Sequence, residues 1–413
     1  MKALHQPAAA LAWLRSPAAI RSRCAALLEL AERDRLDHFA VDADRIDAAA
    51  DYVAEVIAES YPTLEVPLHS RWRQFSAGGI DRWGALARGL ANTAPDEVAR
   101  IRIDLAVTSV LLDAGAGAGW RFREPGSGAC LGRSEGLAAA SLHLFAAGTL
   151  SARPGAPLRA DAAALARIDA RSLAAAFQVG DDNPLVGLDG RAAVLRRLGE
   201  ALAAAPDMFG ATAPRIGNLF NYLAGRARDG RVPAPAILDA VLRALGAVWP
   251  GRPGVDGVSL GDVWRHPAIR TRDLTDGLVP FHKLAQWLTY SLVEPLAEAG
   301  LEVTELDALT GLAEYRNGGL LVDLGVLAPK HDAVLAEVHP VDGEIVVEWR
   351  ALTVALLDRL ADAVRARLDV DAASLPLVKL LEGGTWRAGR KIAASLRADG
   401  GPPIRVASDG TVF

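Results

Sequence analysis

The stretch "RAAVLRRLGEALAAA", residues 191–205, decides the fold class. Its apolar residues recur every three or four positions, which is the spacing of one face of an α-helix. Alanine and leucine are also strong helix formers. The segment "AALLELAERDRLDHF", residues 25–39, repeats this pattern, and alanine and leucine dominate much of the chain. We therefore expect a mainly α protein.

Two segments favour short strands instead. "GEIVVEWRAL", residues 343–352, and the ending "PPIRVASDGTVF", residues 402–413, are rich in β-prone residues, and "SDG" is a turn signal. We expect small β ribbons there, on a single helical catalytic domain that covers residues 1–413. Its expected sub-lobes are residues 1–170 and 171–370, with a C-terminal extension at 371–413.

Composition excludes several classes of protein. The 413 residues are 51% hydrophobic, which is ample for a buried core, and the net charge of −5 offers no field for a nucleic acid partner. The only cysteines, Cys24 and Cys130, favour a reducing, cytoplasmic location. Pro7, Arg15 and Pro17 interrupt the N-terminal apolar stretch, and no later apolar run has the length of a membrane span.

The chain carries no recognisable cofactor or metal motif. "LLDAGAGAGW", residues 111–120, has the spacing G-x-G-x-G, whereas a dinucleotide-binding turn needs G-x-G-x-x-G between a strand and a helix. The eight histidines are scattered without the spacing of a metal motif. We therefore expect neither a cofactor nor a metal.

The stretch "LTGLAEYRNGGLLVDLGVL", residues 309–327, gathers Glu314, Tyr315, Arg316 and Asn317 directly before two glycines. Asn317 is a good N-cap for a helix that begins near Gly318, so the preceding polar residues are expected in a loop at a helix N-terminus. Side chains in such a loop can converge on a ligand. The alternative is a surface cluster in which Glu314 pairs with Arg316 or a lysine.

A second polar group lies in "VPFHKLAQWLTYSLVEPL", residues 279–296. Lys283, Gln286 and Trp287 share one face of the expected helix because their spacing is i, i+3, i+4. The lysine is either held in a pocket or extends to solvent from a buried face. His282, taken alone, is more often a packed or capping residue than a catalyst.

Two further stretches contain candidate binding residues. Asp181, Asp182 and Asn183 form a turn before a helix, where turn chemistry and capping are the simpler explanation. In "EGGTWRAGRKIAASLR", residues 382–397, two glycines and Thr385 are expected to open a helix that could receive a phosphate. A solvated basic helix is the alternative. Its basic residues are Arg387, Arg390 and Lys391.

These four stretches, together with "DLAVTSVLLDAGAGAGW", "VWPGRPG", "LGDVW" and "SDGTVF", resemble the uracil catabolism protein 4 family over nearly the whole chain. "FHKLAQWLTYSLVEPL" and "EYRNGGLLVDLGVL" make the resemblance specific. It implies a role in pyrimidine degradation, with other uracil-catabolic enzymes as partners.

A more distant resemblance implies a chemistry. Queuosine 5'-phosphate N-glycosylases, the queuosine salvage proteins, carry F-Y-K-R-A-Q and, some thirty residues later, D-Y-R-x-P-Q. This chain has "FHKLAQ" and then "EYRNGG" at the same separation. The resemblance implies a helical fold like that of helix-hairpin-helix DNA glycosylases, with Lys283 and Glu314 as the active-site pair.

The sequence departs from that pattern in ways that change the expected base pocket. Glu314 replaces an aspartate, Leu284 an arginine and Ser291 an acid, while residues 317–319 replace x-P-Q. Queuine is therefore not the expected leaving group. The two resemblances together imply hydrolysis of the C1'–N bond of ribosylurea 5-phosphate, a phosphorylated ribosyl substrate, to urea and ribose 5-phosphate.

In this hypothesis Glu314 stabilises the cationic transition state, as a nucleophile or as the base that orients water. Lys283, with His282, donates a proton or a hydrogen bond to the leaving group or positions the substrate. The other expected substrate-binding residues are Gln286, Tyr315, Arg316, Asp182, Asn183, Trp120 and Trp287, although both tryptophans suit a core equally well. Two alternatives remain open. The protein could be a ureide amidohydrolase, which would normally need a metal or a nucleophilic Ser or Cys, or a non-catalytic partner of another uracil-catabolic enzyme.

Overall fold

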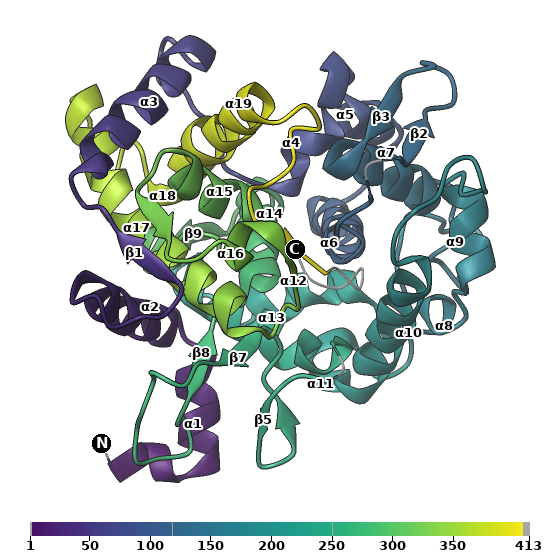
Figure 1. The fold of residues 1–413 in the computed structure, drawn as a ribbon. Coiled ribbons are helices and arrows are strands. Elements are labelled where there is room, and N and C mark those ends of the chain that lie inside the picture. Colours follow the sequence, from purple (N-terminus) through teal and green to yellow (C-terminus); the bar gives the residue numbers. More distant parts are fainter. Residues whose placement is uncertain (1, 118, 250, 408–413) are drawn as a thin grey trace. The chain divides into compact units, whose positions relative to one another are not determined.

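The computed structural model describes residues 2–117, 119–249 and 251–407, shown in Figure 1. The chain divides into two compact units. Unit 1 contains residues 2–69, Gly251–Gln286 and Glu305–Ala407, and unit 2 contains residues 70–249 and Trp287–Thr304. The division falls inside the helix α14 (Lys283–Glu298). The expected organisation, one domain with sub-lobes at 1–170 and 171–370 and an extension at 371–413, remains a prediction.

Unit 1 is organised around its longest helix, α17 (Glu344–Leu368), which packs against α2, α3 and α15. All residues of α17 from Val346 to Val354 are buried, so this part of the helix is covered on every side. The other helical segments that lie wholly in this unit are η1 (Lys2–His5), α1 (Pro7–Leu14), α2 (Pro17–Glu32), α3 (Arg45–Ser60), η6 (Leu306–Ala308), α15 (Tyr315–Asp323), α16 (Ala333–Ala336), α18 (Leu377–Leu380), the π-helical η7 (Leu381–Thr385) and α19 (Trp386–Leu396).

The strand expected at residues 343–352 is wrong, because this segment forms the first turns of α17. Val346, Val347 and Trp349 are buried there, in a helix of 25 residues. A β-branched residue costs a helix only a few tenths of a kcal/mol, whereas burying its side chain contributes on the order of 1.5–3 kcal/mol. Tertiary packing therefore outweighs the local β propensity.

The strands of unit 1 form small two-stranded sheets. The C-terminal segment does supply a strand, but β12 pairs in parallel with the distant β11, and the expected "SDG" turn lies outside the described residues. The pairs are β1 (Phe39–Val41) with β10 (Leu327–Pro329), β5 (Gly254–Val255) with β6 (Val258–Ser259), β7 (Val263–Arg265) with β8 (Leu278–Pro280), and β11 (Val338–His339) with β12 (Arg405–Val406).

Unit 2 is also mainly helical, with α6 (Pro95–Leu111) buried among α7, α10 and α12. Its two small sheets pair β2 (Arg121–Arg123) with β3 (Cys130–Gly132) and β4 (Arg231–Pro233) with β9 (Glu302–Thr304). The other helical segments are α4 (Arg71–Phe75), η2 (Ala77–Gly79), α5 (Arg82–Ala87), η3 (Arg88–Leu90), α7 (Arg133–Ala146), α8 (Ala162–Leu165), α9 (Ala170–Ala176), α10 (Leu188–Ala204), α11 (Pro206–Phe209), η4 (Ile216–Asn218), α12 (Leu219–Ala224), α13 (Ala234–Leu245) and η5 (Gly246–Val248).

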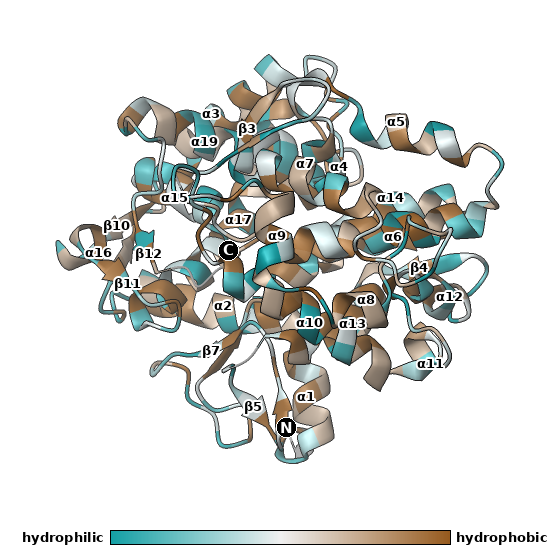
Figure 2. Cartoon of the chain, turned by 90° about the vertical axis from the view of Figure 1, so that its right-hand side faces the viewer, coloured by the Kyte–Doolittle hydropathy of each residue, from teal (hydrophilic) through white to brown (hydrophobic). Residues whose placement is uncertain are grey.

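The helix predicted from residues 191–205 is confirmed as α10, which carries both hydrophilic and hydrophobic residues in Figure 2. Its buried set includes Val194, Leu195, Leu198 and Leu202, at helical spacing. Arg191 is fully buried, and its guanidinium donates to the carbonyl groups of Leu112, Ala114, Gly115 and Val186. Burial lowers the pKa of Arg191 to about 10. The glycine-rich segment therefore wraps around a buried arginine.

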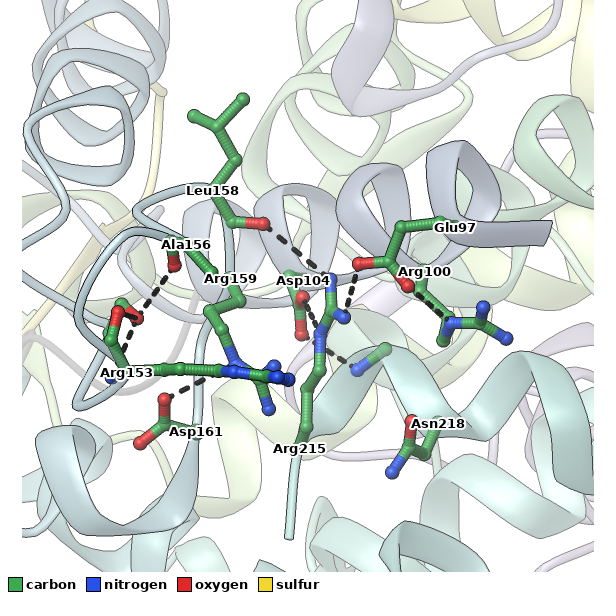
Figure 3. Close-up of polar contacts among 12 residues, drawn as sticks. Glu97, Arg100, Asp104, Arg153, Ala156, Leu158, Arg159, Asp161, Arg215 and Asn218 are labelled. Atoms are coloured by element: carbon green, nitrogen blue, oxygen red, sulfur yellow. Dashed lines mark hydrogen bonds and ion pairs between the residues drawn. The ribbon is translucent and has the colours of Figure 1, made fainter. Parts of the chain in front are cut away.

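A buried ion-pair network ties α6 to η4 in unit 2 (Figure 3). Arg215 donates from Nε to Asp104 at 2.5 Å and from Nη1 to Glu97 at 2.6 Å. The other oxygen of Asp104 accepts from the backbone N–H of Gly217 at 2.7 Å. These three hydrogen bonds join α6 to residues 215–217, so the network has the character of a structural brace.

The fold class is confirmed as mainly α with small two-stranded sheets. Across the parts of the chain that the structure describes, no helix combines the length and the apolar character required to cross a bilayer.

Candidate functional site

Glu314 is the N-cap of α15, and its carboxylate binds the end of the helix. Its Oε2 accepts from the backbone N–H of Arg316 and its Oε1 from that of Asn317, each at 2.7 Å. The expectation that Asn317 caps a helix beginning near Gly318 is wrong, because α15 begins three residues earlier, at Tyr315. The first N–H groups of a helix lack partners within the helix, and Glu314 accepts hydrogen bonds from two of them. The cap is therefore Glu314, and Asn317 is the third residue of the helix.

The two glycines after Asn317 are explained by packing inside unit 1. A Cβ atom on Gly318 would lie 2.6 Å from the ring of Trp349 on α17, and one on Gly319 would lie 3.0 Å from Pro403. α15 therefore crosses α17 at a distance that only glycine allows. Glu314 is held at a helix end whose own position is set by this close contact.

Tyr315 and Arg316 are directed to partners other than the Glu314 carboxylate. The Arg316 guanidinium donates to the carbonyl of Gly400 at 2.7 Å and lies 4.9 Å from the centre of the Tyr315 ring. The surface ion pair between Glu314 and Arg316 considered from the sequence does not form, since both Glu314 oxygens bind backbone N–H groups. Arg316 is nevertheless 5% exposed, so its charge is placed inside the unit beside α15.

Gln286 joins the start of α14 to the segment that leads to Glu314. Its Nε2 donates to Thr310 Oγ1 at 2.8 Å and to the carbonyl of Phe281 at 3.0 Å, while its Oε1 accepts from the backbone N–H of Thr310 at 2.9 Å. Gln286 and Thr310 are both fully buried. The structure therefore uses this predicted binding residue as a structural link.

Asp262 and Arg350 form a second link between the same two segments. Asp262 Oδ2 accepts from the backbone N–H of Lys283 at 2.9 Å, and its two oxygens pair with the Arg350 guanidinium, both at 2.8 Å. Arg350 Nε then donates to the carbonyl of Ala313 at 3.2 Å. Lys283 and the residue before Glu314 are thus connected through one acid and one guanidinium.

His282 adopts a strained backbone conformation between β8 and α14, with φ of 49°. It is 1% exposed, and its Nε2 donates to the carbonyl of Leu14 at 2.9 Å. Burial lowers the pKa of His282, so the ring is neutral near pH 7 and its single proton is already used. Strained positions are retained where the surroundings over-determine them. The geometry of His282 therefore suits positioning of Lys283 better than proton donation.

The Asp262–Arg350 pair makes a prediction for pH dependence. Burial alone would raise the pKa of Asp262, but the Arg350 guanidinium and N–H donors hold it well below the ordinary value of 3.8. The resulting stabilisation is present above the unfolded pKa of about 3.9 and is lost as the pH falls toward the folded pKa. We expect the denaturant midpoint of the parent to fall more steeply between pH 5 and pH 3, as rough bounds, than that of Asp262→Asn.

Urea titrations of both proteins across this range measure the difference directly. If the urea midpoint changed equally with pH in the parent and in Asp262→Asn, the pairing with Arg350 would not lower the pKa of Asp262.

The candidate residues in unit 2 lie on or near the β2–β3 ribbon, apart from Trp287. Asn183 Oδ1 accepts from the backbone N–H of Arg121 at 2.8 Å, and its Nδ2 donates to the carbonyl groups of Arg121 and Gln178. Trp120 is fully buried and donates to the carbonyl of Phe177. Asp182 is exposed on the turn. Trp287 is buried, with the Arg71 guanidinium 5.6 Å from its ring centre.

The basic residues near the C-terminus lie on α19, but Thr385 does not open this helix. The helix is continuous from Leu377 through the π-helical η7 into α19, so its backbone donors at 383–385 are used internally. A Cβ on Gly383 or Gly384 would lie 2.7 or 2.9 Å from Val66 or Val53, which explains both glycines by packing. Arg387 donates to Tyr61, Lys391 pairs with Glu59, and Arg390 lies over the ring of Trp386.

The site therefore contains residues that sequence reasoning missed. Asp262 lies in "LGDVW", but an isolated aspartate in that segment gives no sign of its partner 88 residues later. Arg350 fell within the segment expected to be a strand. In unit 1, Asp262 and Arg350 join the backbone of Lys283 to that of Ala313, the residue before Glu314, and Gln286 joins the start of α14 to Thr310.

Comparison with known proteins is consistent across the whole chain. Residues 13–413 match the family described as "Protein of unknown function (DUF1688)". The "Uracil catabolism protein 4" of Lachancea kluyveri is 39% identical over 410 residues, which cover 91% of this chain and 92% of that protein. "Protein urg3" of Schizosaccharomyces pombe is 38% identical over 401 residues, with 95% and 96% covered. With a family match and relatives of this extent, the chain belongs to the DUF1688 family.

Proposed function

We propose that the protein takes part in uracil catabolism as an N-ribosidase that converts ribosylurea 5-phosphate and water to ribose 5-phosphate and urea. The name of the Lachancea kluyveri relative supports the pathway. The resemblance of "FHKLAQ" and "EYRNGG" to queuosine 5'-phosphate N-glycosylases supports the reaction and a glycosylase-like helical fold.

One observation carries the reaction. Asp262 and Arg350 connect the backbone of Lys283 to Ala313, the neighbour of Glu314, through hydrogen bonds of 2.8–3.2 Å. Catalytic groups have to be held to a fraction of an ångström to be effective. A half-buried aspartate paired with a buried arginine, which together brace the segments of the two proposed catalytic residues, meets this requirement.

Glu314 is suited to stabilise positive charge at C1'. Its carboxylate has about four lone-pair directions, and the two backbone N–H groups use two of them. The remaining lone pairs can face the ribosyl cation or orient the attacking water, and the cap prevents the carboxylate from rotating. Fixed charges of this kind stabilise a transition state without having to reorganise.

In the proposed step, water forms the new C1'–O bond while the C1'–N bond breaks and its electron pair moves to the urea nitrogen. Lys283 donates a proton to that nitrogen, Glu314 accepts the proton that the water loses, and return of this proton to Lys283 restores both groups. Arg316, which is buried in the first turn of α15, supplies positive charge for the substrate phosphate. His282 donates its ring proton to the carbonyl of Leu14, so its role is to position Lys283.

The test is to incubate the purified full-length protein with synthetic ribosylurea 5-phosphate and to quantify urea and ribose 5-phosphate, with and without a chelator. We expect both products in equal amounts. Lys283→Met is expected to lower kcat by about 10²–10⁴-fold. Lys379→Met, which removes another half-buried lysine from unit 1, is the matched control and should retain activity.

Ammonia and carbon dioxide in place of urea would identify an amidohydrolase and contradict the N-ribosidase. Binding of the substrate without turnover would point to the non-catalytic partner instead.

A further inference from the structure

Three histidines that are far apart in the sequence meet in unit 1 beside the first two turns of α17. His38 precedes β1, His331 follows β10, and the pairing of β1 with β10 places them together, with 2.9 Å between His38 Nδ1 and His331 Nε2. His266 follows β7 and approaches Glu344 and Glu348 of α17. The glutamates are four residues apart, so they project from one side of the helix.

Glu348 is fully buried, and only one of its oxygens is satisfied. Its Oε1 accepts from the backbone N–H groups of His38 at 3.2 Å and Phe39 at 2.8 Å. Its Oε2 makes no hydrogen bond to any described residue, and neither does Nε2 of the buried His266, 3.5 Å away. A buried carboxylate oxygen without a partner costs on the order of 1–3 kcal/mol or more, so it requires an explanation.

The surrounding atoms fit a metal ion. One ligand atom from each of His38, Glu344 and Glu348 lies within 4.8 Å of the other two. Two ligand atoms that each lie 2.0–2.2 Å from a tetrahedral ion are about 3.4 Å from each other. A small movement of these side chains toward one another would therefore allow all three to bind one ion. Glu344 can make that movement because 37% of its side chain is exposed. No Lys or Arg of the described residues lies within 4.0 Å of either carboxylate, so a cation would neutralise them.

The hydrogen bonds of His38 and His266 are also compatible with metal binding by His38, Glu344 and Glu348. If His38 Nδ1–H donates to His331, the lone pair of His38 Nε2 faces Glu344, 3.9 Å away. A second hydrogen bond of this kind commonly orients a metal-bound histidine. His266 Nδ1 accepts from the N–H of Ala268 at 3.2 Å, which leaves its Nε2 facing Glu348 Oε2 across 3.5 Å.

We propose that His38, Glu344 and Glu348 bind one divalent transition-metal ion, with Zn²⁺ the best match to one imidazole and two carboxylates. His331 and His266 orient the ligands. The ion joins the segment before β1 to α17, and three protein ligands leave a fourth position open to water. This site uses none of the residues assigned to the N-ribosidase, so it stands or falls independently of that function.

The test is isothermal titration of the chelator-treated, dialysed full-length protein with Zn²⁺, Mn²⁺ and Mg²⁺. We expect one equivalent of Zn²⁺ to bind more tightly than Mn²⁺ and Mg²⁺, with a rise in Tm as the ion stabilises the folded state. Glu344→Gln and Glu348→Gln are each expected to weaken Zn²⁺ binding by about 100-fold, and His331→Ala by about 10–100-fold.

Glu344→Gln is the decisive variant, because the Glu344 side chain makes no hydrogen bond to any described residue, whereas Glu348 accepts from two backbone N–H groups. Glu337→Gln removes an exposed carboxylate nearby in the sequence and is the matched control, with unchanged affinity expected. Failure of the parent to bind Zn²⁺, or equal affinity in Glu344→Gln and Glu337→Gln, would overturn the proposed site.

Discussion

Glu314→Ser is expected to lower the rate of urea release from ribosylurea 5-phosphate by about 10³-fold or more while the protein stays folded. Removal of a fixed charge that stabilises a transition state typically costs 10²–10³-fold in kcat, as a rough guide, and loss of a nucleophile or base costs more. Serine removes the carboxylate but is itself a preferred N-cap residue. The variant therefore separates the two roles that the structure assigns to Glu314.

The comparison with Glu314→Ala makes the test sharper. Alanine removes both the carboxylate and the cap, so we expect an additional loss of about 1 kcal/mol in the free energy of unfolding. Urea denaturation measures this loss, and product release under saturating substrate measures kcat. If Glu314→Ser retained most of the parental kcat, Glu314 would be only a helix cap, and the proposed mechanism would be wrong.

Arg350→Met is expected to lower the free energy of unfolding by about 1–3 kcal/mol, because it leaves the Asp262 carboxylate, whose side chain is 18% exposed, without its guanidinium partner. It also removes the donor to the carbonyl of Ala313. Ala313 directly precedes Glu314, so losing this hydrogen bond is expected to displace the segments that carry Lys283 and Glu314. We therefore also expect kcat to fall by about 10–100-fold. Denaturant titration and the product assay measure the two effects separately.

Arg359→Met is the matched control on the same helix. Arg359 pairs with Glu32, but its side chain is 43% exposed, and exposed pairs contribute about 0–1 kcal/mol. The double variant Asp262→Asn/Arg350→Met completes a thermodynamic cycle, and we expect it to recover part of the stability lost in Arg350→Met. Two results would contradict a bracing role for the Asp262–Arg350 pair. One is an equal loss of unfolding free energy in Arg350→Met and Arg359→Met, and the other is strict additivity of the Asp262→Asn and Arg350→Met effects in the double variant.

The helical character of the protein follows from its local sequence pattern. In α10 the apolar positions repeat at the period of a helix, so local pattern and tertiary packing agree, and the prediction is confirmed. At residues 344–352 the local sequence pattern and the tertiary packing favour different structures. The residues Ile345, Val346 and Val347 favour a strand locally, but burial within α17 contributes more free energy than β propensity does, and sequence reasoning had no access to that burial.

The sequence also singled out the stretches that contain Lys283 and Glu314, since unusual groups of polar residues within apolar segments are visible without a structure. The neighbours of these two residues, in contrast, depend on how the chain folds. Asp262 and Arg350 are 88 residues apart, and His38 and Glu348 are 310 apart, so no local pattern predicts their hydrogen bonds. Such pairs form because folding buries charged groups that must then find partners, and which partners are near depends on how the helices pack.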